Sequence, residues 1–513
     1  MRRTNKTWIK DIIVLSFVYL LIHGFMVILT GTFHDDWLSF FHDKITKDME
    51  GLESGRPYYS LVIELVWLLP GYGYRILAFF TYWCSYLLTY GTFYRIEEVG
   101  RRKALLITMI SMALPINDAR VLLANYPYAL GMMLFSLGTY VLIYNLRELN
   151  KIWIRLSTLL LFFLSFTLNS NLVLYGIVIL YLLMKIGLKK VYTYIDFVIL
   201  PILFYCLNQK LFPVYGAYID YNLVTVDKAK WAVTAIPEIL TETFVSLVRV
   251  IGKENAKVWF AVLLTAITLS IGFIMSHKKK PVKQEEELEE IDEESGALFL
   301  FGIVALIAGL FSYAVIRQHP NIAITGIQGR DSMQMGLGIA MMVAGGTNRK
   351  IRTGIVMFIV FAGVLHFNTW YMNYQTEWYR QYAYQKQIVE VPDVLEGGNF
   401  IVNCSQPSRI SDRRFYTWAG NTAAATGRRN TFMLNGENDT NVLHNPSTME
   451  SILSHHPMYK DYEYTTDIRG IIDYQVEIST IDGLRLKWKE VFNPQGFEEE
   501  IRNIGSIDYL KNQ

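Results

Sequence analysis

Two adjacent carboxylates, Asp35 and Asp36, follow the first long apolar stretch of the chain, in the sequence GTFHDDWLSF. Charged side chains are costly beside a bilayer, and neighbouring carboxylates repel each other. Partial desolvation raises the pKa of a carboxyl group, which then accepts a proton as a general base near neutral pH. The alternative is that the pair only ends the first helix at the membrane surface and faces water. The pair is the first candidate for chemistry.

Cationic side chains that can hold a phosphate form the second group of candidates. The guanidinium of arginine is a planar fork of N–H donors that matches phosphate oxygens. Each arginine alone is equally well explained as a side chain that reaches toward lipid headgroups, but several together favour an anion site. The topology below places these candidates on the side of the acidic pair: Arg56, Arg120, Arg249, Arg317, His319 and Arg330.

The composition is that of a membrane protein. Of the 513 residues, 52% are hydrophobic and 18% are charged, and the mean hydropathy is +0.23. A soluble protein would carry about 25% charged residues. The net charge of +2 gives no indication of a nucleic-acid partner. Three cysteines, Cys84, Cys206 and Cys404, are too scattered for a disulfide framework or a zinc site.

The elements that position these residues are predicted to be transmembrane helices. Apolar stretches long enough to cross about 30 Å of hydrocarbon recur through residue 372. Residues 59–70 are too short to cross, and we expect a helix on the outer face there. We predict about eleven spans by hydropathy, with approximate positions 11–31, 73–93, 104–115, 128–145, 155–168, 172–187, 193–212, 257–276, 297–315, 333–346 and 353–372.

Lysine and arginine placement predicts the orientation, because cytoplasmic loops carry an excess of both. The basic segments alternate with the spans so that all fall on one side, and the N-terminus is then cytoplasmic. The acidic pair and three loops, 117–128, 213–255 and 317–332, then lie outside the cytoplasm. The basic segments are 1–6, 95–103, 147–155, 185–190, 277–284 and 348–352.

The composition changes at about residue 373 to that of a soluble region. Short β-rich runs at 399–404, 473–480 and 484–492 are separated by clusters of turn residues. We therefore predict two domains, a transmembrane domain of residues 1–372 and a small α/β domain of residues 373–513. An odd number of spans places the second domain outside the cytoplasm.

This arrangement resembles the GT-C class of integral-membrane glycosyltransferases. In that class the first span leads to an outer loop that opens with an acidic pair, followed by a surface helix and a second membrane segment. The matching residues are HDDW at 34–37, the amphipathic segment after it, and SGRPYY at 54–59. The likeness is greatest to bacterial enzymes that decorate cell-surface polysaccharides, including serotype-converting glucosyltransferases, and it covers the architecture of the whole chain.

The resemblance implies a substrate class and a location. The donor would be a sugar on a polyprenyl-phosphate carrier, the acceptor a cell-surface glycan, and the location a bacterial plasma membrane. An aspartate would deprotonate the acceptor hydroxyl, and we assign this role to Asp36 in preference to Asp35. The other carboxylate would bind the acceptor or a divalent cation such as Mg²⁺ or Mn²⁺, whose use varies across the class.

The resemblance also extends to two later loops. Residues 117–128 (NDARVLLANYPY) resemble the second outer loop, which lines the substrate cavity. The segment GIQGRDSMQ at 326–334 resembles the Gly-Arg that precedes a late span, although Asp331 departs from that pattern and can neutralise Arg330. Aromatic rings stack on sugars, and Glu64 lies in the short surface segment. The candidates for substrate binding are Trp37, Tyr58, Glu64, Asp118, Asn125 and Tyr126.

Other classes of membrane protein remain alternatives. A transporter should show internal repeats and ionisable residues in the middle of its spans, and the sequence shows neither pattern clearly. Polymerases and ligases of lipid-linked polysaccharides also use outer arginines and the same carriers, but usually carry a large late loop instead of a terminal domain. A receptor with an outer sensor domain would leave the acidic pair unexplained.

Overall fold

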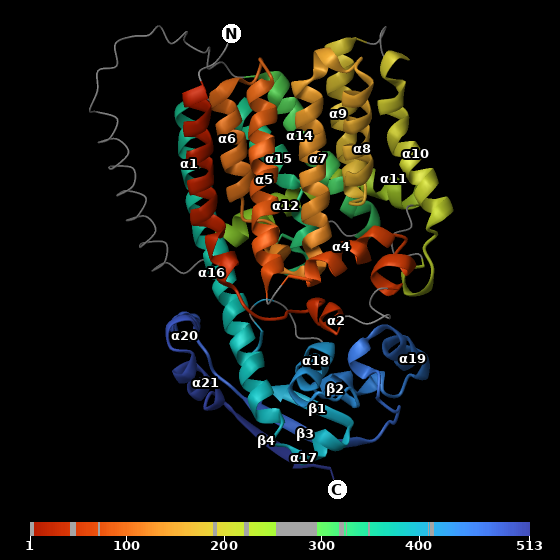
Figure 1. Ribbon diagram of the computed structural model, residues 1–513, viewed down its shortest axis with the longest axis vertical. Helices are drawn as coiled ribbons and strands as arrows, with labels where there is room; N and C mark the ends of the chain where they lie inside the picture. The colour runs from red at the N-terminus through yellow and green to blue at the C-terminus, as the bar shows by residue number, and fades with distance from the viewer. Residues whose placement is uncertain are drawn as a thin grey trace, which may run out of the picture.

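A computed structural model describes residues 5–41, 48–69, 72–187, 192–219, 225–252, 295–317, 323–324, 326–346, 349–408, 410 and 415–512. The chain forms a bundle of long helices with a C-terminal unit, residues 392–512, at one end (Figure 1). We call the end of the bundle that faces this unit the sheet end, and the opposite end the far end.

The bundle consists of long helices joined by short helical turns. Their bounds are α1 Asn5–His23, η1 Gly24–Ile28, α2 Asp36–Phe40, η2 Asp48–Glu53, α4 Pro57–Trp67, α5 Gly73–Arg95, α6 Gly100–Ala113, η3 Asp118–Val121, η4 Leu123–Asn125, α7 Tyr126–Tyr144, α8 Ile152–Ser165, α9 Ser170–Ile186, α10 Ile195–Leu211, α11 Val226–Thr234, α12 Ile236–Gly252, α14 Gly296–Arg317, η8 Ile327–Ser332, α15 Met335–Gly346 and α16 Arg349–Ile388.

Helices in this bundle are long and apolar enough to cross a membrane, as predicted. Within the described residues, five segments pass on length and composition, and α11 with α12 make a sixth if this pair, bent by 61°, counts as one span. The five are Thr7–Ile28, Leu123–Tyr144, Tyr192–Leu211, Gly296–Ile316 and Ile351–Ile388. The chain is therefore a helical membrane protein.

The count of eleven spans stays a prediction. Four further predicted spans coincide with helices of 12 to 17 residues, α6, α8, α9 and α15, and a helix rises only about 1.5 Å per residue. A fifth coincides with α5, which is longer but does not pass the combined test of length and apolar composition. The predicted span 257–276 lies outside the described residues.

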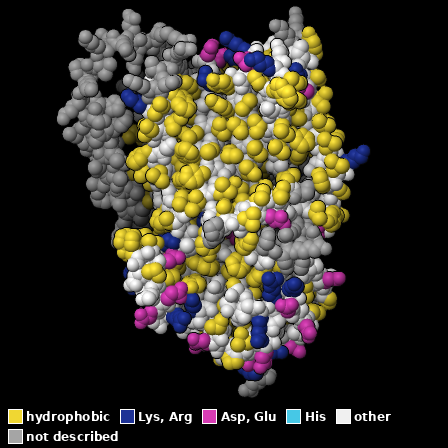
Figure 2. All heavy atoms as spheres, in the orientation of Figure 1, with side chains coloured by type: hydrophobic (Ala, Val, Ile, Leu, Met, Phe, Trp, Pro, Cys, Tyr) yellow, Lys and Arg dark blue, Asp and Glu magenta, His cyan; other side chains and the backbone are white. Residues whose placement is uncertain are grey.

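Hydrophobic side chains form a broad belt across the face of the bundle that Figure 2 shows, with charged side chains beyond it at both ends. The pairs Arg101–Asp11 and Lys151–Glu148 lie at the far end, with nitrogen–oxygen distances of 2.7 and 2.8 Å. Because hydrocarbon does not solvate charge, the belt marks the part of the bundle that lipid surrounds.

The predicted loop 213–255 is wrong over most of its length, because it contains α11 and α12. The side chain of Thr225 caps α11 by accepting the Lys228 N–H at 3.2 Å. Pro237 lies in the first turn of α12, where a proline disrupts no hydrogen bond. The apolar residues of α12 are spaced at helical intervals between Glu238, Glu242 and Arg249, a pattern typical of an amphipathic helix.

The C-terminal unit is an α/β structure with a four-stranded sheet of order β2-β1-β3-β4. The first three strands are parallel, and β4 is antiparallel to β3. Phe400 and Ile472 are fully buried in its core. The bounds are α17 Pro392–Glu396, β1 Gly398–Cys404, α18 Phe415–Thr426, β2 Thr431–Asn435, α19 Pro446–His455, β3 Ile468–Gln475, α20 Thr480–Phe492, α21 Pro494–Arg502 and β4 Ser506–Lys511.

One of the predicted β-rich runs is wrong. Residues 399–404 form most of β1 and residues 473–475 end β3, but residues 484–492 belong to helix α20. A capping box starts this helix, because Ser479 accepts the Asp482 N–H and the Asp482 side chain accepts the Ser479 N–H. This local signal outweighs the β-branched and aromatic content of the run.

Helix α16 connects the two parts of the chain without a break. Its 40 residues extend about 60 Å, twice the thickness of the hydrocarbon layer. The predicted domain boundary at residues 372–373 falls inside this helix. Its last turns carry Tyr379 and Tyr384 into the core of the C-terminal unit, where both are fully buried.

Candidate functional site

The acidic pair lies between the bundle and the C-terminal unit, where α2 sits at the sheet end (Figure 1). The chain reaches α2 through a sharp turn. His34 has a φ of 45°, which is unusual for a residue other than glycine. Gly31 has a φ of 110°, and a Cβ there would lie 2.4 Å from the Trp378 side chain. Local strain of this kind is often retained where it positions a functional group.

Asp36 is almost fully buried, with 2% of its surface exposed. Its Oδ1 accepts the Ala124 N–H at 3.1 Å, and its Oδ2 accepts the Tyr74 O–H at 3.3 Å. Burial raises the pKa of Asp36 from 3.8 to about 6, against the opposing effects of the Ala124 amide and the Arg75 charge. A carboxyl group with this pKa can accept and release a proton near neutral pH.

Asp35 has the opposite character. Its side chain is 28% exposed, and its Oδ1 lies 2.6 Å from His34 Nδ1 and accepts the Tyr416 O–H at 3.0 Å. Burial opposes ionisation, but the hydrogen bond and charge of His34, the charge of Arg330 and the Tyr416 bond together lower the pKa of Asp35 to about 2. The surroundings therefore separate the pKa values of two adjacent carboxyl groups, so that one stays ionised and the other titrates.

A buried arginine fixes the backbone around the pair. Arg75 on α5 donates to the carbonyl oxygens of Leu29 at 3.1 Å, Gly31 at 2.6 Å and Val121 at 3.1 Å. The first two precede α2, and the third precedes the Ala124 amide that binds Asp36. Sequence reasoning placed Arg75 inside a predicted span and missed this role, because the pattern does not show that its partners are backbone carbonyls.

Arg56 and Arg330, two of the predicted phosphate-binding residues, converge on one phenol. Arg56 Nη1 donates to the Tyr128 hydroxyl at 3.5 Å, and the Arg330 guanidinium carbon lies 5.8 Å from the centre of the Tyr128 ring. Arg330 Nη1 also donates to Asn125 Oδ1 at 3.3 Å. Arg56 Nε is buried and has no hydrogen-bond partner among the described residues. A buried donor without a partner is costly, and an anion between the two guanidinium groups would satisfy it.

Asp118 and Arg120, from the predicted second outer loop, are engaged in contacts within the bundle. Asp118 Oδ1 lies 2.7 Å from His366 Nε2, and its Oδ2 accepts the Gly326 N–H at 3.3 Å. Arg120 donates to the carbonyl oxygens of Asn117 and Ile116, and its Nη1 lies 3.1 Å from His23 Nε2. These contacts tie the loop to α1 and α16.

Trp37, Tyr58 and Tyr126 also make interior contacts. Trp37 is fully buried in the core of the C-terminal unit, and its indole N–H donates to Gln381 Oε1 at 3.3 Å. The Tyr58 hydroxyl donates to the Thr167 carbonyl at 3.1 Å, and the Tyr126 hydroxyl lies 3.4 Å from Thr81 Oγ1.

The remaining predictions for the site concern Glu64, Arg317, His319 and the surface helix after the acidic pair. Glu64 is half-buried on α4. The Arg317 side chain and His319 lie outside the described residues. The segment predicted as a surface helix after the pair is described only at its ends, as α2 and the single π-helical turn η2.

The C-terminal unit contributes residues that sequence reasoning missed. Tyr416 on α18 binds both Asp35 and His34, and its ring centre lies 5.4 Å from that of His456. Burial lowers the pKa of His456 to about 4, so this ring is neutral at physiological pH. His455 Nε2 lies 3.4 Å from Glu53 Oε2 on η2. Asp35 and Tyr416 are 381 residues apart, and no local pattern could pair them.

The divalent cation stays a prediction. The described residues bring together no group of three His, Cys, Asp or Glu side chains suited to a metal ion. Asp36 binds N–H and O–H donors through both oxygens, and the Asp35 oxygen nearest its neighbours is occupied by His34 and Tyr416.

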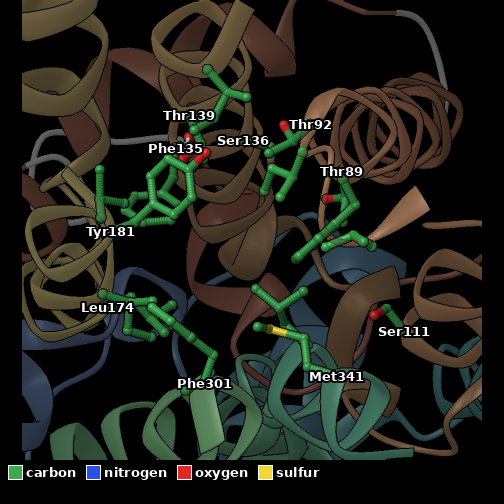
Figure 3. A pocket seen from close by; sticks show the side chains of 18 of the residues that line it. Thr89, Thr92, Ser111, Phe135, Ser136, Thr139, Leu174, Tyr181, Phe301 and Met341 are labelled. Atoms are coloured by element: carbon green, nitrogen blue, oxygen red, sulfur yellow. Dashed lines mark hydrogen bonds between the residues drawn. The ribbon is translucent and has the colours of Figure 1, made fainter. Parts of the chain in front are cut away.

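A cavity of about 290 Å³ lies inside the bundle, lined mainly by apolar side chains. Figure 3 shows side chains of α5, α7, α9, α14 and α15 arranged around a central space. Met333 and Gln334, directly after η8 and Arg330, line it on one side, and Glu98 and Lys185 line it toward the far end. Lys185 pairs with Glu98 there.

Comparison with known proteins adds no family. No protein-family model matches the chain, and no curated protein matches its sequence.

Proposed function

We propose that this chain is a membrane glycosyltransferase that moves a sugar from a polyprenyl-phosphate carrier to a hydroxyl group of a cell-surface glycan. The observation that carries the proposal is the meeting of two kinds of group at the sheet end. The two carboxyl groups of the acidic pair have different pKa values, and the charge of Arg330 contributes to the low pKa of Asp35. Arg330 also converges with Arg56 on Tyr128. A base beside an anion site is what this transfer requires.

The orientation of the chain supports an extracytoplasmic site. Helix α1 begins at the far end, together with the basic segments around Arg101 and Lys151 (Figure 1). Basic segments mark the cytoplasmic side, so the sheet end and the C-terminal unit would face away from the cytoplasm of a bacterial cell. Nucleotide sugars are absent there, and a lipid-linked donor takes their place.

Asp36 would act as the general base. Its carboxylate accepts the proton of the acceptor hydroxyl as the hydroxyl oxygen forms a bond to the anomeric carbon of the donor. The bond from that carbon to the phosphate oxygen breaks, and the carrier leaves as polyprenyl phosphate. Asp35, ionised throughout, would accept hydrogen bonds from neighbouring acceptor hydroxyls. The Tyr74 and Ala124 donors hold the Asp36 carboxylate in place.

Arg330 and Arg56 would stabilise the charge on the leaving phosphate. Both are always protonated, and Arg56 has a donor without a partner among the described residues. Fixed cationic donors aimed at a developing charge typically account for 10²- to 10³-fold in rate per group.

The internal cavity has the character needed for the hydrocarbon chain of the carrier. Its lining is mainly apolar, and it begins at Met333 and Gln334, which follow Arg330 in the chain. A carrier with its phosphate at Arg330 could place its chain among α5, α7 and α14.

The decisive experiment uses the full chain in lipid nanodiscs with polyprenyl-phosphate-linked radioactive sugars and an extracted cell-surface glycan. Transfer of label to the glycan by the native protein, and its loss in Asp36→Asn with the same gel-filtration profile, would support the proposal. Full transfer by Asp36→Asn would reject this base. In proteoliposomes, labelled-carrier counterflow without any new glycosidic bond would identify a transporter instead.

A second experiment tests the phosphate site without turnover. Polyprenyl phosphate should raise the thermal midpoint of the native protein, and this shift should shrink in Arg330→Ala and Arg56→Ala. Arg469→Ala is the matched control, since Arg469 is exposed in the C-terminal unit and pairs with Glu396. Equal shifts in all the variants would place the phosphate elsewhere.

A further inference from the structure

Helix α20 carries an exposed apolar face that the site does not use. Five large hydrophobic side chains on it are 52% to 81% exposed: Ile481, Leu484, Trp488, Val491 and Phe492. At about 100° per residue these positions occupy a continuous arc of roughly 100° on the helix. The opposite face packs inward, with Gly483 and Leu486 buried. An arc of this kind is unusual on a surface that faces only water.

Contacts place α20 at the level where the membrane helices end. Thr30, two residues after the first membrane segment, donates to Glu490 Oε1 at 3.1 Å. Thr480 and Gly483 meet α16 at Asn373 and Thr376, where the donor–acceptor distance from Thr480 Oγ1 to Asn373 Oδ1 is 3.4 Å. Figure 2 shows hydrophobic side chains over the position of α20, just beyond the apolar belt of the bundle.

Charged residues of α20 flank the arc and do not interrupt it. Arg485 and Lys489 both pair with Glu500 on α21, with 2.6 Å between Arg485 Nη2 and Glu500 Oε1. Lys487 pairs with Glu490 on the inner side at 2.7 Å. Trp488 lies in the middle of the arc, its ring centre 4.2 Å from that of Phe492. Tryptophan is enriched at membrane interfaces, where the ring is apolar and the N–H meets polar headgroups.

We propose that α20 is an interfacial helix, whose apolar arc lies among the headgroups and first methylene groups of the leaflet at the sheet end. The occupant of this face is the lipid of the membrane that the bundle spans. The apolar arc continues the apolar belt of the bundle, and α20 lies at the level of Thr30 and Asn373. These two observations favour lipid over another protein as the occupant. The interaction would hold the C-terminal unit against the membrane at a second point besides α16. It does not depend on the proposed catalytic activity.

Spin labels in nanodiscs test the inference. The three native cysteines are replaced by serine or alanine, and single cysteines are introduced by Leu484→Cys, Trp488→Cys or Val491→Cys. Leu510→Cys on β4, where the native side chain is 57% exposed, is the matched control. Collision rates are measured with oxygen, which concentrates in lipid, and with a nickel chelate, which stays in water.

The expected result is an oxygen-to-nickel ratio several-fold higher at the three α20 positions than at position 510. Equal ratios at all four positions would overturn the inference, because the arc would then face water. Low collision rates with both probes, together with dipolar broadening, would show that a second copy of the chain covers the face, and would also overturn it.

Fluorescence gives an independent readout if the cysteine-free chain does not fold. The emission of the native protein minus that of Trp488→Phe isolates Trp488. Lipids brominated near the headgroup should quench this difference signal. An unquenched signal would place Trp488 outside the lipid and refute the inference.

Discussion

Replacing Asp36 by asparagine should make the protein more stable at neutral pH while removing its proposed activity. The folded protein raises the pKa of this carboxyl from 3.8 to about 6, chiefly because the side chain is buried. At pH 7 the group must be ionised in a place that disfavours charge. This rise in pKa lowers the unfolding free energy of the native protein at pH 7 by about 3 kcal/mol. The variant with the neutral asparagine amide avoids this loss.

The pH dependence isolates this effect from any change in packing. A raised folded-state pKa gives a stability that is present below about pH 3.8 and is lost as the pH rises to about 6. The stability difference between Asp36→Asn and the native protein should therefore be small near pH 4 and grow to about 3 kcal/mol by pH 7. A change in packing alters this stability difference by the same amount at every pH, so it does not change the increase between pH 4 and pH 7.

The neighbouring carboxyl is a control with the opposite sign. The pKa of Asp35 is lowered to about 2, so its ionised form stabilises the fold above pH 3.8, and this stability is lost as the pH falls toward 2. Asp35→Asn should therefore destabilise the protein at pH 7, by about 1 to 2 kcal/mol after allowance for solvent screening of this partly exposed side chain.

Reversible unfolding in mixed micelles, followed by circular dichroism between pH 4 and 8, measures both variants. A shift in stability in the same direction for Asp36→Asn and Asp35→Asn at pH 7 would refute the opposite pKa shifts of the two carboxyl groups. A pH-independent difference in stability between Asp36→Asn and the native protein would also refute the raised pKa of Asp36, because burial would then not oppose the charge of this carboxylate.

Three further predictions concern the same region. The rate of sugar transfer should fall below about pH 6, where Asp36 becomes protonated, and a flat profile down to pH 5 would contradict its role as base. Tyr416→Phe removes a donor to Asp35 and should cost about 1 kcal/mol in stability while raising KM for the acceptor more than it lowers kcat, which steady-state kinetics would measure. Trp37→Ala leaves a cavity against Gly420 and should cost about 3 to 5 kcal/mol, seen as faster proteolysis of the C-terminal unit; unchanged cleavage would count against this docking.

Part of the fold follows from the sequence because it depends on composition over long windows. The apolar stretches predicted a helical membrane protein, and residues 399–404 predicted a strand that β1 confirms. Local capping decided the error at 484–492, where Ser479 and Asp482 start a helix that the β-like composition concealed.

The candidate site depends on contacts between distant segments, which a single sequence does not encode in any local pattern. Asp36 meets Ala124, and Asp35 meets Tyr416, across 88 and 381 residues. Arg75 binds backbone carbonyls, so the identity of its partners leaves no trace in the sequence. The sequence predicted only that Arg56 and Arg330 lie on the same side of the membrane, and did not predict that they converge.

The hydrogen bond between Tyr416 and Asp35 also determines when the site can form during biosynthesis. A ribosome makes Tyr416 381 residues after Asp35. Until α18 emerges and docks on α2, Asp35 lacks one of its donors and Trp37 lacks the core that buries it. The first membrane segment is therefore synthesised long before the site that follows it can be completed.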